Sequence, residues 1–325
     1  MTSDRLSHAV EAGLTLPATG RILLLGAPGD LDLRDFPEDR CDVVQGFRPD
    51  HDAWAARGLP VSTEAGGDHG AAVVFLPRAR DRAEARIAAA CAAAPGGLIV
   101  VDGQKTDGVE SMLRAVKARV PVAGHVSKAH GKCFWFTASD AFGDWARGPA
   151  CNAHGHWTAP GVFSADAPDP GSERLLAALP PKLGGTVADL GAGWGGLASG
   201  LLTRDGIRTL HLVEADHAAL DCARRNVEDA RAVFHWADAT RWKPTSPLDT
   251  VVMNPPFHQG RRADPAIGQA FITAAAKALK PTGHLWLVAN RHLPYESVLE
   301  SRFRETAEVS GDARFKILHA SRPAR

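Results

Sequence analysis

The sequence has little of what disulfide frameworks, zinc ribbons or membrane anchors require. Its 325 residues contain five cysteines, an odd number, scattered without a CxxC pair. This usage argues against structural disulfides and favours the reducing cytoplasm. The longest apolar stretch, Ile87–Val101, is interrupted by Pro95-Gly96-Gly97 and is shorter than the roughly 20 residues of a membrane span. The first five residues lack an apolar core behind a basic start, so we expect no signal peptide and no membrane partner.

The chain also lacks net charge, because 37 Lys and Arg residues balance 37 Asp and Glu residues. Taken alone, this neutrality argues against nucleic acid as a partner. The charges are unevenly spread, however. Ten acidic and four basic residues lie between Asp30 and Asp68, whereas eleven basic and six acidic residues lie between Pro255 and Arg325. The distribution therefore permits an anionic partner on the C-terminal half.

What the sequence does contain is the pattern of an α/β protein, and it contains that pattern twice. Both halves alternate short β-branched runs with Ala-rich stretches, which is typical of a mostly parallel sheet covered by helices. In the second half we predict strands at 186–190, 209–214, 232–236, 250–253, 284–289 and 315–319, with helices such as 195–203, 217–230 and 265–279. In the first half we predict strands at 21–25, 42–45, 71–75, 98–102 and 133–136.

Between the halves, residues 149–170 are rich in Gly, Pro, Asp and His and predict a linker. We therefore expect one domain over 1–150 and a second over 160–325. The linker holds Cys151, His154 and His156, the nearest approach to a metal-binding cluster. Their spacing matches a zinc site poorly, so we interpret them as polar linker residues and expect no metal.

The two halves resemble each other, which points to a duplicated domain. Gly97 and Gly283 each open a predicted strand, and thirteen residues later both halves carry the pattern Glu-Ser-x-Leu. The first copy has lost the residues that a ligand needs: Leu24 stands for Asp189, Pro28 for Gly193, and Leu76-Pro77-Arg78-Ala79 for Asn254-Pro255-Pro256-Phe257. We expect the first copy to be chemically inert. Two unrelated α/β domains are the alternative.

A glycine-rich turn, Asp189-Leu-Gly191-Ala-Gly193-Trp-Gly195, follows a predicted strand and opens a predicted helix. Its glycines let the chain turn tightly and approach a ligand closely. The spacing also satisfies the dinucleotide fingerprint, so an NAD-dependent dehydrogenase is an alternative. Asp189 argues against it, because a carboxylate at that position repels a pyrophosphate but suits the ammonium group of S-adenosylmethionine.

Two further acids end the next two predicted strands. Glu214 is placed to accept hydrogen bonds from ribose hydroxyls, which both cofactors carry. Asp238 is placed to accept from an adenine amino group. We therefore predict S-adenosylmethionine as the cofactor, bound by Asp189, Gly191, Gly193, Glu214 and Asp238.

The motif Asn254-Pro255-Pro256-Phe257 ends the fourth predicted strand, at the same sheet edge as the glycine turn. A ring amine is a poor nucleophile because its lone pair is delocalised. The Asn254 side-chain oxygen and the Pro255 carbonyl can accept its two N–H bonds and aim the lone pair at a methyl donor, while the prolines stiffen the loop. Phe257 offers a face on which a planar base can stack. These four residues are the predicted catalytic site.

These motifs resemble the ribosomal RNA guanine-N2 methyltransferases, most closely the ribosomal RNA small subunit methyltransferase C type. The resemblance rests on Pro160–Ser164, Asp189–Gly193, Asn254–Gly260 and Leu287–His292, and in the first half on Gly103–Gly108 and Lys128–Lys132. It implies two tandem Rossmann-like class I methyltransferase domains, the N-terminal one degenerate. It also implies methyl transfer from S-adenosylmethionine to guanine N2 in small-subunit rRNA, by a cytoplasmic enzyme whose partner is ribosomal RNA or the small ribosomal subunit.

A net charge close to zero is unusual for an enzyme that binds rRNA. We therefore expect the RNA contacts to come from a local cluster of basic residues. We nominate Arg261, Arg262, Lys105, Lys128 and Lys132 for RNA contacts, and we expect a monomer. Several alternatives stay open: large-subunit guanine-N2 enzymes, protein-glutamine and adenine-N6 methyltransferases with similar loops, the dehydrogenase, and a non-catalytic ribosome-assembly factor.

Overall fold

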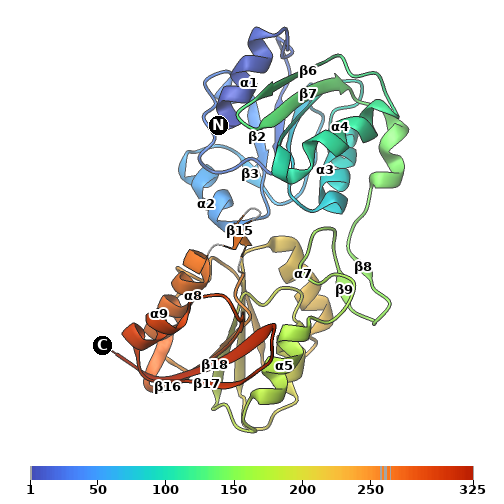
Figure 1. Ribbon diagram of the computed structural model, residues 1–325. Helices are drawn as coiled ribbons and strands as arrows, with labels where there is room; N and C mark the ends of the chain where they lie inside the picture. The colour runs from blue at the N-terminus through green and yellow to red at the C-terminus, as the bar shows by residue number, and fades with distance from the viewer. Residues whose placement is uncertain (1, 257, 260–261, 264, 325) are drawn as a thin grey trace. The chain divides into compact units, whose positions relative to one another are not determined.

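The computed structural model describes residues 2–256, 258–259, 262–263 and 265–324. The chain divides into two compact units, Met1–Gly148 and Pro149–Arg325. Each unit contains a seven-stranded sheet with helices beside it (Figure 1). Each also has its own apolar core on both faces of that sheet. Within the described ranges no helix is long and apolar enough to cross a bilayer.

The sheet of the first unit consists of β1 (Ile22–Leu25), β2 (Cys41–Val44), β3 (Val61–Ser62), β4 (Ala71–Phe75), β5 (Leu98–Gln104), β6 (Gly124–Lys128) and β7 (Gly131–Thr137). Its order is β3-β2-β1-β4-β5-β7-β6, and β7 runs in the opposite direction to the other six strands. One face packs against α3 (Arg80–Ala93), α4 (Val109–Lys117) and η3 (Asp140–Trp145). The other packs against α1 (Thr2–Glu11) and α2 (Arg48–Ala56). Two further 3-10 turns are η1 (Glu38–Arg40) and η2 (Lys105–Asp107).

The central strands are apolar throughout because both of their faces are covered. In β1, Leu23 and Leu25 contact the core on the α3 side, whereas Ile22 and Leu24 contact the core on the α1 side. Such strands are short uninterrupted apolar runs, and this is the signal by which the sequence predicted them.

The second unit begins with the short pair β8 (Ala150–Cys151) and β9 (Trp157–Thr158). Its sheet consists of β10 (Thr186–Leu190), β11 (Thr209–Glu214), β12 (Ala232–Trp236), β13 (Leu248–Met253), β16 (Leu279–Asn290), β17 (Phe303–Gly311) and β18 (Phe315–Pro323). A separate hairpin is formed by β14 (His258–Gln259) and β15 (Arg262–Ala263). The helices are α5 (Pro170–Ala178), α6 (Gly196–Leu202), α7 (His217–Asn226), α8 (Pro265–Ala278) and α9 (Glu296–Arg302).

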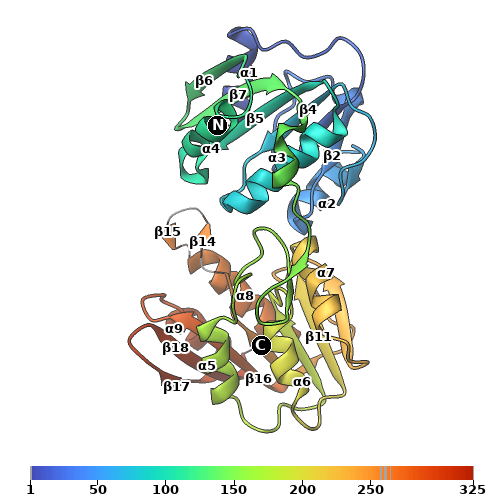
Figure 2. The ribbon, with the colours of Figure 1, turned by 90° about the vertical axis from the view of Figure 1, so that its right-hand side faces the viewer.

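The order of the second sheet, β12-β11-β10-β13-β16-β18-β17, repeats the order of the first sheet strand for strand. Helices α5 and α6 cover one face, and α8 and α9 cover the other. Figure 2 shows α5 and α6 lying over the same side of this sheet. The predicted fold class, two tandem Rossmann-like α/β domains, is confirmed.

The predicted bounds hold for β10, β11 and β12, but β17 was not predicted. Eight of the nine residues in β17 are exposed, because it is the edge strand of the sheet and pairs only with β18. An exposed edge strand buries no apolar face, so it leaves no hydrophobic pattern in the sequence.

Candidate active site

The carboxyl ends of β11, β10 and β13 lie side by side, because these parallel strands are neighbours in the sheet. The chain moves outward in one direction from β10 to β11 and β12, and then crosses to β13 on the other side. Open α/β sheets bind ligands where the strand order reverses in this way. The glycine turn after β10 and the Asn254 motif after β13 therefore share the ligand-binding edge of the sheet.

The glycine turn depends on three left-handed residues. Gly191, Gly193 and Gly195 have φ angles of +79°, +56° and +91°, which residues with a Cβ rarely adopt. A Cβ on Gly195 would lie 2.8 Å from Val227 Cγ2 at the end of α7. A Cβ on Gly193 would meet no heavy atom of the described residues within 4 Å. Gly193 therefore leaves its backbone open to a ligand.

Glu214, the last residue of β11, supports this turn. Its Oε2 accepts a hydrogen bond from the Gly193 backbone N–H at 2.8 Å, and its Oε1 accepts from the Asp216 N–H at 2.8 Å. Burial raises the pKa of Glu214, and these two backbone donors oppose that rise. The carboxylate predicted to bind a ribose thus also ties the end of β11 to the glycine turn.

Asp189, in β10, lacks any compensation for its burial. The residue is 0% exposed, and neither carboxylate oxygen has a hydrogen-bond partner among the described residues. Burial, with the neighbouring Glu214, raises the pKa of Asp189 to about 8. Buried polar groups are normally paired, since an unpaired one is costly. A cationic ligand group, directly or through water, would supply the missing partner, so this site fits the ammonium group of S-adenosylmethionine.

Asp238 lies just after β12, which is separated from β10 in the sheet by β11. Its Oδ1 accepts from the Thr240 N–H at 2.8 Å and from the Thr240 hydroxyl at 2.6 Å. The side chain is half-buried at the sheet edge. The structure thus places the three predicted acids at the ends of three consecutive strands.

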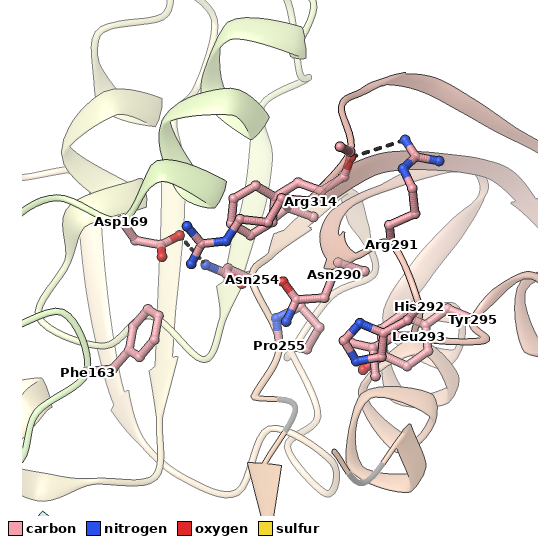
Figure 3. Close-up of a pocket in the computed structure, with 14 residues that line it drawn as sticks. Phe163, Asp169, Asn254, Pro255, Asn290, Arg291, His292, Leu293, Tyr295 and Arg314 are labelled. Atoms are coloured by element: carbon pink, nitrogen blue, oxygen red, sulfur yellow. Dashed lines mark hydrogen bonds between the residues drawn. The ribbon is translucent and has the colours of Figure 1, made fainter. Parts of the chain in front are cut away.

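Asn254 follows β13, and its amide nitrogen is held by the start of α5. Its Nδ2 donates to Asp169 Oδ2 at 2.9 Å and to Ser172 Oγ at 3.0 Å. Figure 3 marks the contact with Asp169 as a dashed line. Asn254 is half-buried, Pro255 is buried and Pro256 is exposed. The Asn254 side chain is therefore fixed by its contacts with the start of α5. The loop that follows it reaches the surface two residues later, at Pro256.

Asn254 lines two cavities. One, of about 240 Å³, also borders Gly191 and Gly193. The other, of about 790 Å³, also borders Pro255 and Arg314. The smaller cavity thus reaches the glycine turn, but the three predicted acids are not among the residues that line it.

Three residues line both cavities, and two of them were not predicted from the sequence: Phe163 and Asp169 accompany Asn254. Phe163 is 58% exposed although it is a large apolar side chain. Arg314 lies with its guanidinium 4.9 Å from the centre of the Phe315 ring, and Figure 3 shows its side chain extending into the larger cavity. The signal for Phe163 was present in the sequence, because this residue lies within the motif Pro160–Ser164 that carries part of the family resemblance.

Part of the predicted substrate site cannot be placed. Phe257 and Arg261 lie outside the described residues. Arg262 begins β15, where it pairs with Gln259 of β14 in a two-stranded hairpin. No group of three or more His, Cys, Asp or Glu residues in the described part of the chain is placed to hold a metal ion.

The three nominated lysines lie in the first unit, at one end of the β6–β7 hairpin. Lys128 pairs with Gly131 across the hairpin, and the Lys105 N–H donates to the His130 carbonyl at 2.9 Å. Lys105 and Lys128 are exposed. The Lys132 ammonium lies 3.4 Å from Glu110, and its side chain is only 18% exposed. The structure thus brings the three together but leaves two of them accessible.

Comparison with known proteins covers both units. Residues 155–319 match the family model described as methyltransferase small domain. The chain is 29% identical to the ribosomal RNA small subunit methyltransferase C of Hahella chejuensis, over 94% of this chain and 95% of that protein. It is 32% identical to the protein of the same name from Chromohalobacter salexigens, over 84% of this chain and 86% of that protein. Among solved structures it is similar to a T. thermophilus 16S rRNA guanine-N2 methyltransferase in complex with AdoMet and guanosine, with a TM-score of 0.79, 26% identity, and coverage of 99% of this chain and 91% of that chain.

Proposed function

Because the chain belongs to the ribosomal RNA small subunit methyltransferase C family, we propose that it transfers a methyl group from S-adenosylmethionine to the exocyclic N2 of a guanine in 16S rRNA. One observation of the site carries the proposal: Asn254 lines both the cavity at the glycine turn and the larger cavity. A dehydrogenase with a nicotinamide cofactor does not account for an acceptor side chain fixed between the two.

We assign the cofactor to the smaller cavity and to the sheet edge beside it. Gly191 and Gly193 offer backbone without a Cβ, and the unpaired Asp189 carboxyl group suits the ammonium group. Glu214 would accept from the ribose, and Asp238 from the adenine amino group. When bound, the cofactor supplies an electrophilic methyl group on a sulfonium.

The residues of the second unit position the guanine amine. The Asn254 side-chain oxygen and the Pro255 carbonyl accept its two N–H bonds, so the nitrogen lone pair turns towards the smaller cavity. Pro255 and Pro256 keep this loop stiff and the acceptors in place. Phe257 would stack on the base, which contributes about 1–3 kcal/mol. Orientation contributes more to the rate than proton transfer does, since the donor sulfur is already a good leaving group.

The first unit supports the substrate rather than the reaction. We assign the exposed Lys105 and Lys128 to phosphate contacts there, and Arg261 and Arg262 to contacts from the catalytic unit. Lys132, which lies beside Glu110 and is only 18% exposed, does not fit that role. The target guanine leaves its stack to reach the site, at a cost of a few kcal/mol. We propose that the enzyme acts as a monomer on rRNA or on the small ribosomal subunit, in the cytoplasm where that subunit is made.

The experiment that tests this function is transfer of a labelled methyl group to undermethylated small subunits, large subunits and naked rRNAs. We expect label on 16S rRNA, at a single guanine that mass mapping identifies as N2-methylated. Label confined to large subunits would overturn the small-subunit assignment. Absence of label from every RNA would overturn the proposed function.

Substituting Asn254 by Ala removes the side-chain acceptor without touching the glycine turn. We expect methyl transfer to fall at least about 100-fold, because a preorganised hydrogen-bonding group is lost from the transition state. The affinity for S-adenosylmethionine, measured by calorimetry, should stay within a few fold of wild type. Loss of cofactor affinity instead would remove Asn254 from the catalytic role.

A further inference from the structure

Asn254 serves as an acceptor only if its oxygen, and not its nitrogen, faces the substrate amine. The two ends of a carboxamide have nearly the same size, and a half-turn of the group exchanges them. Shape alone therefore leaves the orientation open. The partners on the far side of the group must decide it.

Those partners are Asp169 and Ser172, which lie 2.9 Å and 3.0 Å from Asn254 Nδ2. An ionised carboxylate only accepts hydrogen bonds. If the carboxamide turned over, its oxygen would face the Asp169 oxygen, and a charge-assisted hydrogen bond would become a repulsive contact. Asp169 thus selects the orientation in which Oδ1 is directed away from α5.

Asp169 is itself fixed independently of Asn254. It is the N-cap of α5, and its Oδ2 accepts from the Ser172 backbone N–H at 2.7 Å. Helix α5 is anchored in the core through Leu175, which is 0% exposed. The carboxylate therefore has a defined position, and it borders both cavities together with Asn254.

We propose that Asp169, assisted by Ser172, is a positioning residue that holds the Asn254 carboxamide with Oδ1 presented to the substrate amine. The proposal rests on the proposed function, because it requires an amine as the methyl acceptor. Asp169 does not contact the reacting atoms. It acts through Asn254 alone.

The decisive variant is Asp169→Ser. Serine caps helices about as well as aspartate, so α5 keeps its N-cap while the carboxylate is removed. We expect the single-turnover rate of methyl transfer to small subunits to fall roughly 10- to 100-fold, in the range of a lost hydrogen bond to a charged group. The affinity for S-adenosylmethionine and the thermal midpoint should stay close to wild type.

Two further variants separate positioning from a structural role. Asp169→Asn keeps the shape and one acceptor oxygen, so it should retain more activity than Asp169→Ser. The double variant Asp169→Ser with Asn254→Ala should transfer methyl groups as slowly as Asn254→Ala alone, because the residue through which Asp169 acts is gone.

The outcomes are distinguishable. An active wild type with an equally active Asp169→Ser variant would refute the positioning role and leave the proposed function standing. An additional loss of rate in the double variant, or a fall in thermal midpoint that accounts for the lost activity, would also refute it. An inactive wild type would refute the proposed function itself.

Discussion

Strand β1 pairs with β2 in the first unit in the same register as β10 pairs with β11 in the second. The residues at the ends of these strands can therefore be compared one by one. Leu25 pairs with Val44 in the first unit, and Leu190 pairs with Val213 in the second. The backbone N–H that follows donates to the second strand at 2.8 Å in both cases. Gln45 therefore occupies the position of Glu214, a correspondence that sequence comparison had not revealed.

Both side chains accept through Oε1 from the backbone N–H two residues further along the chain, and only their second polar atoms are used in opposite ways. Glu214 accepts from the Gly193 N–H, whereas Gln45 donates through Nε2 to the Ala27 carbonyl at 2.8 Å. The first unit has Pro28 at the position of Gly193, and proline has no N–H to donate. In the first unit, therefore, the donating Gln45 side chain stands in place of the accepting Glu214, because Pro28 offers no N–H from which to accept.

The turn of the first unit is also closed by neighbouring side chains. A Cβ on Gly26 would lie 2.1 Å from Nη1 of Arg86, which donates to the Phe75 carbonyl at 2.7 Å. Trp54 Nε1 donates to the Ala27 carbonyl at 3.0 Å. The fold thus persists in both units because their apolar strands persist, whereas the ligand site depends on a few strand-end residues.

The largest effect is expected when the turn of the first unit is copied into the second. Gly193→Pro imposes a φ of about −65° where the chain has +56°, and it removes the N–H that Glu214 accepts. We expect the affinity for S-adenosylmethionine to fall at least about 100-fold, from strain and a lost hydrogen bond together. Calorimetry measures this. The matched variant Pro28→Gly should leave the affinity unchanged. Equal affinity in both variants would show that the residue at this position does not decide cofactor binding.

A smaller effect follows from Asp189, whose counterpart Leu24 cannot ionise. Its pKa of about 8 in the folded protein lies above the ordinary value of about 3.9. The protonated form therefore stabilises the free protein, fully below pH 4 and progressively less as the pH rises through 8. A bound ammonium group favours the ionised form, so binding releases a proton below pH 8.

The affinity for S-adenosylmethionine should therefore rise on the order of tenfold or more between pH 6 and pH 8. Calorimetry in two buffers with different ionisation enthalpies would detect the released proton. Asp189→Asn should bind more weakly and lose this pH dependence. An unchanged pH dependence in that variant would mean that another group releases the proton.

The smallest effect tests what the first unit has kept. Lys105→Gln and Lys128→Gln should each weaken rRNA binding several fold and lower its dependence on salt by roughly one ion. Affinity for S-adenosylmethionine should not change. Lys117→Gln, on the exposed surface of α4, is the matched control. If all three variants behave alike, the first unit does not grip RNA through its hairpin end.

Prediction from sequence went furthest where a pattern depends on local chemistry. Buried strands such as β10 are recognisable because both faces require apolar side chains, and the strand-end acids were found because they follow such strands. The edge strand β17 was not predicted, and the exposed Phe163 was not predicted as a site residue. In both cases exposure imposes no pattern on the neighbouring residues. Gln45 was missed because its counterpart became visible only through the strand register.

Local sequence patterns are enough to predict the two α/β units, the glycine turn, and the order of Asp189, Glu214 and Asp238 along successive strand ends. The orientation of the Asn254 side chain depends instead on long-range packing. Its partner Asp169 lies 85 residues away in the chain, and no periodicity or motif spacing connects the two. Side chains so far apart meet only after the sheet and α5 have packed, because it is the core that brings their backbones together.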